Sequence, residues 1–578
     1  MPTTITKVNS VFSTTATNPI LMNTSDTLTV DFGGYLMATV ADAVVMNGAS
    51  QTYTVNVNGS VESFNAPSGA ALYLSQATSV ANINVGMTGA IKGPLAIATV
   101  GTANITNAGQ IANSSASFAA VNIDGAGNYT INNSGLIANN NVTGIAVKLA
   151  GAGTHTFTNS GLLNVTAGQT AFYSNNVAGI DNITNTGRIN GALDLGGGVD
   201  TVHNENGIIV GGIFLGDGDD FYYGSSNAEQ AVDNVTGGNG IDTIYGYGGN
   251  DILNGGVGDD VMVGGLGNDT YIVDSQTDTV TEILAEGTAD RVKSSVNYVL
   301  AATANVEYLE TQLASGTTAV NLTGNALANI INGNAGDNVL DGGVDSALDR
   351  LVGGAGNDTY IIRSAADTVT ELTGGGTDAI QTSVSYTLAL GAFVESMSTT
   401  NAAGTTAINL IGNASVGTTI TGNAGNNILG GGSDAFVDAL IGGAGNDTYQ
   451  LGTNTNDTIT DTAGLDTIET YATRDMSTLF TTIEDLKLMG VAVINGTGNA
   501  LNNVITGNLA ANVLNGAGGN DTISGMGGND TLTGGAGTDI FVFKTALNAT
   551  SNKDTITDFT AVDDIMHLEN TGTGLFTS

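Results

Sequence analysis

Apolar and polar positions alternate along much of the chain, and the alternation returns at fixed intervals. Between residues 100 and 210 an apolar residue is followed two positions later by Asn and four positions later by Gly, four times over. The central residues of these four copies stand 26 residues apart, at Asn107, Asn133, Asn159 and Asn185. Alternating β-branched and polar residues predict strands, and Asn-x-Gly supplies the turns between them. A period of this length predicts stacked coils, since one coil cannot bury its own apolar side. We therefore expect a parallel β-helix with a ladder of stacked Asn side chains.

A second repeat is nine residues long and occurs in two blocks, at 237–272 and 516–542. Glycines open each copy, an Asp stands sixth and an apolar residue eighth. The sixth positions are Asp242, Asp251, Asp260, Asp269, Asp521, Asp530 and Asp539. The first and fourth positions are Gly237, Gly240, Gly246, Gly249, Gly255, Gly258, Gly264, Gly267, Gly516, Gly519, Gly525, Gly528, Gly534 and Gly537. The glycines allow a turn with positive φ, and the last three residues of each copy predict a short strand with its eighth position in the core.

Two such repeats make one coil of 18 residues, which places Asp242 over Asp260 and Asp251 over Asp269. Carboxylates stacked at the spacing of adjacent strands repel each other, and a hard divalent cation between them removes that repulsion. Oxygen ligands alone favour Ca²⁺, whereas the absence of Cys and the lack of His in the repeats disfavour zinc and copper. The alternative is an array of Gly/Asp turns that holds no metal. We expect multiple bound Ca²⁺ ions.

The nonapeptides resemble those of the RTX (repeats-in-toxin), or haemolysin-type calcium-binding, proteins, and the resemblance covers about residues 264–542. The segment GGLGNDTY at 264–271 returns at 353–360 and 442–449 as GGAGNDTY, followed each time by DTVTE or DTITD and later by a Val-Glu or Ile-Glu pair. This plan resembles the spacer modules of that family. The resemblance adds four further metal-ligand candidates, of which the last two are degenerate copies: Asp358, Asp447, Asp200 and Asp220.

Several turns depart from the repeat. Asn occupies the sixth position at Asn329, Asn338, Asn427, Asn503 and Asn512, so these turns are expected to bind Ca²⁺ weakly or to form Asn ladders. Two further acids are expected to be poorer ligands, because no glycine turn directly precedes them: Asp349 and Asp438.

These patterns predict an all-β fold in which a parallel β-helix is followed by calcium-binding parallel β-rolls. The expected divisions are a β-rich N-terminal cap or head at 1–100, a β-helix at 101–222, calcium rolls at 223–275 and 516–545, spacer modules of about 89 residues at 276–515, and a closing segment at 546–578. The 26-residue repeats resemble those of adhesin and autotransporter passengers.

Composition narrows the function. The 578 residues carry a formal net charge of −41, which excludes nucleic acid or an anionic membrane as a partner held by charge. No apolar stretch is long enough for a transmembrane helix. The N-terminus shows no cleavable secretion signal. The resemblance implies type I secretion through an uncleaved C-terminal signal, which we expect to be shortened, processed or removed here.

Catalytic chemistry has few candidate residues. The histidines are His155, His203 and His567, so HExxH is absent, as is GxSxG. His155 is expected to be an exposed strand residue, and we assign no catalytic residue. The chain is therefore expected to be a secreted, non-enzymatic structural or adhesive protein that Ca²⁺ folds after export, with a possible glycan or cell-surface ligand. The alternatives are a self-assembling surface-layer or filament protein and a secreted polysaccharide-modifying enzyme with an RTX tail.

Overall fold

A computed structural model describes short strands among the first fifty residues and most of the chain beyond them. The described residues are 4–5, 11–14, 20–22, 27–30, 35–38, 44–46, 51–63, 70–74, 80–98, 101–114, 118–226, 232–283, 287–432, 435–545 and 550–569. Their regular structure is entirely β, in 63 strands. No helix in this part of the chain is suited to crossing a membrane. The chain divides into two compact units, Met1–Gln312 and Leu313–Ser578.

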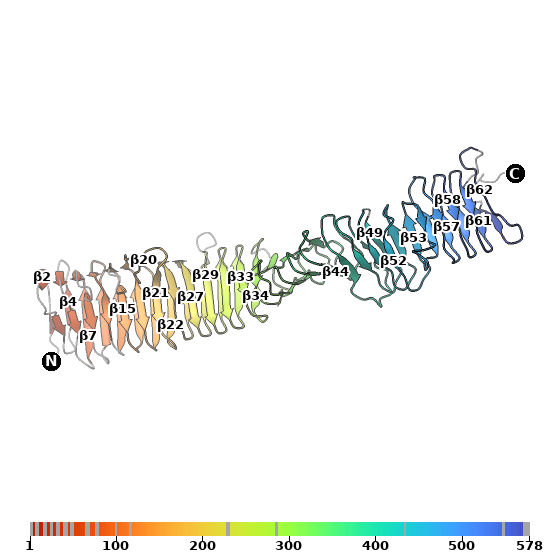
Figure 1. Ribbon diagram of the computed structural model, residues 1–578. Helices are drawn as coiled ribbons and strands as arrows, with labels where there is room; N and C mark the ends of the chain where they lie inside the picture. The colour runs from red at the N-terminus through yellow and green to blue at the C-terminus, as the bar shows by residue number, and fades with distance from the viewer. Residues whose placement is uncertain are drawn as a thin grey trace. The chain divides into compact units, whose positions relative to one another are not determined.

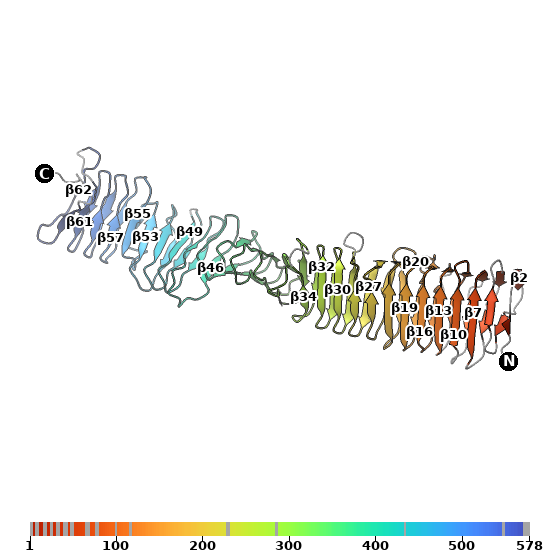
Figure 2. The same cartoon turned by 180° about the vertical axis from the view of Figure 1, so that it is seen from behind.

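The first part of unit 1 is a β-helix with three strands in each coil. One coil consists of β13 (Thr102–Asn107), β14 (Gln110–Asn113) and β15 (Val121–Asp124). The next coil repeats it with β16 (Tyr129–Asn133), β17 (Leu136–Asn139) and β18 (Val147–Ala150). Each strand pairs in parallel with its counterpart in the next coil, and Figure 2 shows β13, β16 and β19 (Thr154–Asn159) side by side. The predicted 26-residue stacking is confirmed, because Ile105 pairs with Ile131 and Ile131 with Phe157.

Buried asparagines form the predicted ladder inside this β-helix. Each Nδ2 donates to the Oδ1 of the equivalent residue one coil on, at 2.7–2.8 Å. A fourth bond of 2.7 Å extends the ladder from Asn185 to Asn204. Each Asn thus satisfies a buried neighbour, so the ladder specifies coil register as well as filling the turn.

The β-helix continues directly into a two-strand roll. One of its sheets ends at β26 (Ile208–Val210), while the other two continue. In one, β28 (Phe221–Tyr223) pairs with β30 (Thr243–Gly248); in the other, β27 (Gly212–Asp217) pairs with β29 (Asn234–Asn239). Coils shorten because a side of the helix is lost, which is why the repeat falls from 26 residues to 18.

A single apolar column runs through both parts of unit 1. It joins the isoleucines of the 26-residue repeat to the eighth positions of the nonapeptides, in the order Ile105, Ile131, Phe157, Ile183, Val202, Tyr222, Ile244, Met262 and Val280. All nine are at most 2% exposed. The predicted core positions Ile244, Leu253, Met262 and Tyr271 are each fully buried. The two repeats therefore share a core.

Unit 2 is also a stack of parallel coils. One sheet extends from β38 (Leu322–Thr323) to β52 (Thr458–Thr460), a second from β45 (Tyr386–Thr387) to β63 (Ile565–Leu568), and a third from β54 (Arg474–Asp475) to β62 (Thr555–Ile556). Figure 1 shows β53 (Thr467–Thr470), β57 (Val504–Thr506) and β61 (Ile540–Phe543) in sequence along the stack. A buried column again fills the interior, in the order Leu340, Tyr360, Ile380, Met397, Ile420 and Leu440.

The all-β solenoid is therefore confirmed. Strands within 51–63 and 80–98 add coils to the same sheets, since β7 (Thr52–Val57) pairs with β10 (Val80–Val85) and β10 with β13. The cap was predicted at 1–100, and much of its first half lies outside the described residues. So do residues 546–549 and 570–578 of the predicted closing segment. The domain boundaries stay predictions.

Candidate metal centre

Aspartates of successive coils form two hydrogen-bonded ladders in unit 1. In each, the backbone N–H of one Asp donates to a carboxylate oxygen of the acid one coil further on, which is the Oδ1 of an Asp at every step but the last of the second ladder, where it is Glu307 Oε2. Distances along the first ladder are 2.7–3.0 Å, in the order Asp181, Asp200, Asp220, Asp242, Asp260 and Asp278. Distances along the second are 2.7–2.9 Å, in the order Asp233, Asp251, Asp269, Asp290 and Glu307. The predicted stacking of Asp242 with Asp260 and of Asp251 with Asp269 is confirmed.

Unit 2 repeats the arrangement in shorter ladders that begin at Asn. One runs through Asn338, Asp358, Asp378 and Glu395. The next module gives Asn427, Asp447, Asp466 and Glu484. Near the C-terminus the two ladders are Asn503, Asp521, Asp539, Asp564 and Asn512, Asp530, Asp554. All eleven predicted Asp ligands thus lie in ladders, but they are distributed over both units.

The second carboxylate oxygen of many ladder residues is buried without a hydrogen-bond partner. In unit 1 this holds for the Oδ2 atoms of Asp200, Asp220, Asp242, Asp251, Asp260 and Asp290, and in unit 2 for those of Asp358, Asp378, Asp447, Asp521 and Asp530. A buried, unpaired carboxylate oxygen is costly, so these atoms indicate a missing ligand. They are an observation that points to a cation independently of the repeat sequence.

The glycine at the first repeat position leaves space for this oxygen. A Cβ on Gly237 would overlap both the Oδ2 of Asp242 and the backbone oxygen of Gly255 in the next coil. All seven predicted first-position glycines face the Asp of their own repeat in this way. Carboxylate and backbone carbonyl oxygens therefore converge beside Gly237, Gly246 and Gly516, and oxygen is the ligand type that Ca²⁺ prefers.

The fourth position needs glycine for its backbone conformation. All seven predicted fourth-position glycines have positive φ, from 112° at Gly519 to 159° at Gly258. Three second positions have lost their glycine and still have positive φ: Tyr247 (65°), Ala517 (75°) and Met526 (70°). These side chains accept a left-handed conformation that costs about 1–2 kcal/mol outside glycine.

Burial raises the pKa of the ladder carboxyls well above the ordinary value for Asp. The pKa of Asp242 rises to about 7 through burial and then through the charges of Asp220 and Asp260. Burial, with the charges of Asp233 and Asp269, raises the pKa of Asp251 to about 8. The N–H donated along the ladder acts in the opposite direction but does not cancel the effect. Without a cation, the buried ladder carboxyls must take up protons near neutral pH. A bound cation would instead compensate their negative charge.

The donor set fits Ca²⁺. It consists of hard oxygens alone, from buried carboxylates and from backbone carbonyls, with no thiolate or imidazole among the nonapeptide residues. Asp residues in the turns would hold the ion, and its charge would offset the repulsion between coils.

The two acids that stand outside the regular repeat also lie in ladders, and their rank as ligands stays a prediction. Asp349 and Asp438 are full members of ladders, each accepting a bond of 2.8 Å from the coil before. Each has a glycine seven residues earlier, Gly342 for Asp349 and Gly431 for Asp438. A Cβ on either glycine would overlap the Oδ2 of its Asp, as in the regular repeats. The loop between glycine and Asp is two residues longer, so the nine-residue pattern hides an equivalent turn.

The sixth-position asparagines start ladders. The Nδ2 of Asn338 donates to the backbone oxygen of Val320 at 2.9 Å, and that of Asn512 to Ile494 at 2.6 Å. A neutral amide thus uses its own donor where an Asp would present a second charge. At Asn338 and Asn512, where these ladders begin, the side-chain amide therefore finds its hydrogen-bond partner within the protein.

His155 is not the exposed strand residue expected from the sequence. It is 1% exposed, its ring stacks on Tyr129 with centroids 4.8 Å apart, and its Nδ1 lies 2.8 Å from Asp181 Oδ1. Asp181 is the first acid of its ladder, and the same column reads Tyr53, Ala81, Ala103 and Tyr129 before it. His155 therefore lies between the apolar residues at the start of this column, which end at Tyr129, and the ladder acids that begin at Asp181.

Several acids in the ladders or directly beside them were missed by the nine-residue pattern. They include Asp181, Asp233, Asp278, Glu282, Asp290, Glu307, Glu371, Asp378, Glu395, Asp461, Asp466 and Glu484. A signal was present, because DTVTE and the Val-Glu pairs recur with each module. The sequence alone does not show that the extra residues between these acids form loops outside the ladder, so the nine-residue spacing misses them.

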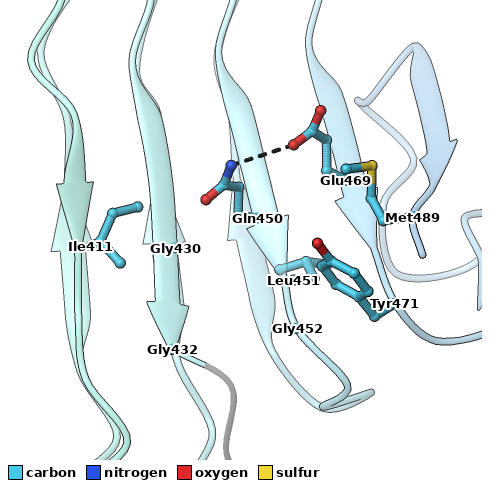
Figure 3. A pocket seen from close by; sticks show the side chains of 9 residues that line it. All are labelled: Ile411, Gly430, Gly432, Gln450, Leu451, Gly452, Glu469, Tyr471 and Met489. Carbon is cyan, nitrogen blue, oxygen red and sulfur yellow. Dashed lines mark hydrogen bonds between the residues drawn. The ribbon is translucent and has the colours of Figure 1, made fainter. Parts of the chain in front are cut away.

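The surface of unit 2 has a shallow hollow of about 170 Å³, drawn in Figure 3. Gly430 and Gly432 open it, and Gln450 Nε2 donates to Glu469 at 3.3 Å across it. Glu469 is the single carboxylate in the lining and is paired with Lys487 at 2.8 Å.

Comparison with known proteins identifies the repeats. The family model for the RTX calcium-binding nonapeptide repeat, built of four copies, matches residues 233–271, 323–360, 451–476, 497–532 and 506–541. The matched segments contain ladder acids from both units. No curated protein matches the chain.

Proposed function

We propose that this chain, which carries RTX calcium-binding nonapeptide repeats in a β-solenoid, is a secreted protein whose rolls fold when Ca²⁺ enters the ladders outside the cell. The observation behind this is the set of buried carboxylate oxygens without a hydrogen-bond partner, from Asp200 to Asp530. Sites of the extracellular class bind Ca²⁺ at about 10⁻⁴–10⁻³ M, so they fill outside a cell and empty inside one. Binding to the folded state alone stabilises that state by mass action.

We further propose that the folded protein has a structural or adhesive role and no catalytic one. Between 101 and 190 the ionisable side chains of Asp, Glu, Lys, Arg and His are Asp124, Lys148, His155, Asp181 and Arg188. Two of these, His155 and Asp181, are buried against each other, where no external substrate reaches them. The long, regular sheets instead offer a rigid surface to a glycan or another cell-surface ligand.

Self-assembly is the second candidate, and one observation favours it. Strand β63 is exposed along its length, with Ile565, Met566 and Leu568 each more than half exposed. An exposed edge strand with apolar side chains can pair with another chain.

Sedimentation velocity on chelator-treated protein, titrated with Ca²⁺, tests these proposals together. A monomer whose frictional ratio falls as Ca²⁺ is added supports a calcium-folded monomeric protein and directs the search to glycan-binding screens. Growth to large, ordered species favours the surface-layer or filament alternative. Sedimentation that does not respond to Ca²⁺ would reject calcium-driven folding, and turnover of polysaccharide by the monomer would reject the non-enzymatic role.

A further inference from the structure

Three clusters of carboxylates lie along the ladders, about one module apart. Each contains the Asp of a GGxGNDTY segment, an acid that closes the following DTVTE or DTITD segment, and an acid from the next coil of the ladder. The clusters are Asp269, Glu282, Asp290 in unit 1, and Asp358, Glu371, Asp378 and Asp447, Asp461, Asp466 in unit 2. In each, one oxygen from every member lies within 4.8 Å of the others. Within the described residues, three acids come together in this way at these turns alone.

A tyrosine hydroxyl closes each cluster from inside the core. Tyr271 donates to Glu282, Tyr360 to Glu371, and Tyr449 to Asp461. All three tyrosines are fully buried and occupy the eighth repeat position, where the first block otherwise has Ile244, Leu253 and Met262. The opening glycines complete the enclosure, because a Cβ on Gly264 or Gly442 would overlap the Tyr hydroxyl and the neighbouring carboxylates.

Buried oxygens in each cluster lack a partner. In every case the Oδ1 accepts the N–H of the coil before, and the Oδ2 is left inside the cluster without a hydrogen bond. This is true of Asp290 in the first cluster, of Asp358 and Asp378 in the second, and of Asp447 in the third. These four residues are at most 1% exposed. Among the described residues, no ion pair involves a member of the second or third cluster, so no side-chain cation compensates the three adjacent acids there.

The size and chemistry of the clusters fit one divalent ion each. Ca²⁺ lies about 2.3–2.6 Å from its oxygens, so two ligands on opposite sides stand up to about 5.2 Å apart. The separation of 4.8 Å falls inside that limit. The third cluster also borders a hollow of about 280 Å³ lined by Asp461, Asp466 and Glu484, which gives an ion a way in from solvent.

We propose that these three clusters are a second class of Ca²⁺ site, in which three side-chain carboxylates replace the single carboxylate per turn of the nonapeptide sites. Affinity in such sites rises with the number of charged ligands and with rigidity. The clusters therefore fill first as Ca²⁺ rises, and each pins the start of one module before the ordinary turns are occupied. This deepens the proposed function and rests on it only for the identity of the ion.

Terbium luminescence on the full chain tests the assignment, because Tb³⁺ replaces Ca²⁺ and is excited by a nearby tyrosine. The chain has no Trp, so tyrosines provide the sensitised emission. We expect a tight phase of emission that the Y271F/Y360F/Y449F variant reduces by more than half while metal binding, measured by equilibrium dialysis, persists. The E282Q/E371Q/D461N variant should weaken the tight phase at least tenfold. The single E371Q variant, which leaves two clusters intact, should remove about a third of its amplitude.

The matched control is D242N/D521N/D530N, which removes one carboxylate from ordinary turns outside the clusters. It should lower the weaker phase and leave the tight phase unchanged. If the tight phase survives E282Q/E371Q/D461N while the control loses binding, the clusters are not metal sites and the nonapeptide function stands. If neither variant changes Tb³⁺ or Ca²⁺ binding, both proposals fail. Circular dichroism in Ca²⁺ confirms that each variant is folded, and E371Q remains informative if the triple variant is not.

Discussion

Replacing Asp251 by Asn should change stability in opposite directions with and without Ca²⁺. The substitution preserves the size of the side chain and the Oδ1 that accepts the N–H of Asp233 at 2.8 Å. It replaces the Oδ2 that has no hydrogen-bond partner. In the absence of a cation, that change removes a carboxyl group that must take up a proton to be buried. In Ca²⁺ it removes a ligand.

The magnitude follows from the pKa of Asp251, which burial raises from 3.8 to about 8. Each unit of difference is worth about 1.4 kcal/mol, so near neutral pH the folded state without cation is disfavoured by at most about 5 kcal/mol. Burying the new amide N–H₂ returns about 1–3 kcal/mol of that gain. We expect D251N to stabilise the cation-free unit by about 2 kcal/mol. In Ca²⁺ at about a hundred times Kd, loss of one ion removes about 2.7 kcal/mol.

The assay is thermal unfolding by circular dichroism over a Ca²⁺ series that starts in chelator. The midpoint of D251N should lie above that of the natural protein in chelator and below it in saturating Ca²⁺, with a shallower dependence on Ca²⁺ concentration. D475N is the control, since Asp475 is exposed and its loss should leave the two curves parallel. Equal destabilisation by D251N in both conditions would refute the reasoning, because it would give the carboxylate a purely structural role.

Four further predictions follow from the same contacts. Acidification should stabilise the cation-free protein: folded pKa values of about 6 for Asp220, 7 for Asp242 and 8 for Asp251 exceed the unfolded value, so stability is full below about pH 4 and is lost as the pH rises through 6–8. In Ca²⁺ protons compete for the carboxylates, and chemical denaturation should show the opposite trend. L253A should cost about 2–5 kcal/mol by denaturant unfolding, because Leu253 is fully buried. N159A should cost about 1–3 kcal/mol by the same measurement, because it leaves the Nδ2 of Asn133 without its acceptor. A517G should raise the thermal midpoint, with a gain of about 1 kcal/mol from relief of a φ of 75°.

The regular part of this molecule was predictable from the sequence because its periods survive intact. The spacing of 26 residues places Asn107 on Asn133, and that of 18 places Asp242 on Asp260, as the hydrogen bonds confirm. Alternation also identifies the core, since Ile244 and Leu253 point inward where the eighth position predicts. Stacking demands the same geometry from every coil, so a repeated residue has a repeated environment.

The acids outside the nine-residue pattern escaped because loops absorb extra residues while the ladder keeps its spacing. Asp269 follows Asp251 by 18 residues, but Asp290 follows Asp269 by 21, and both bonds measure 2.7 Å. A search for residues 18 apart misses Asp290, although its hydrogen bond in the ladder is as short as that of Asp269. The third acid of each cluster escaped for another reason: Glu282 adjoins a strand of the opposite sheet, and sequence distance does not show which turns meet.

His155 was placed wrongly although alternation held the answer. It stands two residues before Phe157 on one strand, so both side chains point to the same face, which is the core. Polarity argued for exposure, but the partner that makes burial tolerable, Asp181, is 26 residues away. Buried polar residues are found by their partners, which only the stacked coils reveal.

Hydrogen–deuterium exchange in chelator and in Ca²⁺ tests most directly whether the ion folds the rolls. The amides of Asp242, Asp251 and Asp260 donate along the ladders, whereas those of β13, β16 and β19 belong to a β-helix held by apolar residues and Asn. The account predicts the same protection of the β-helix in both conditions and much stronger protection of 233–307 in Ca²⁺ than in chelator. Equal protection of 233–307 in chelator would contradict it.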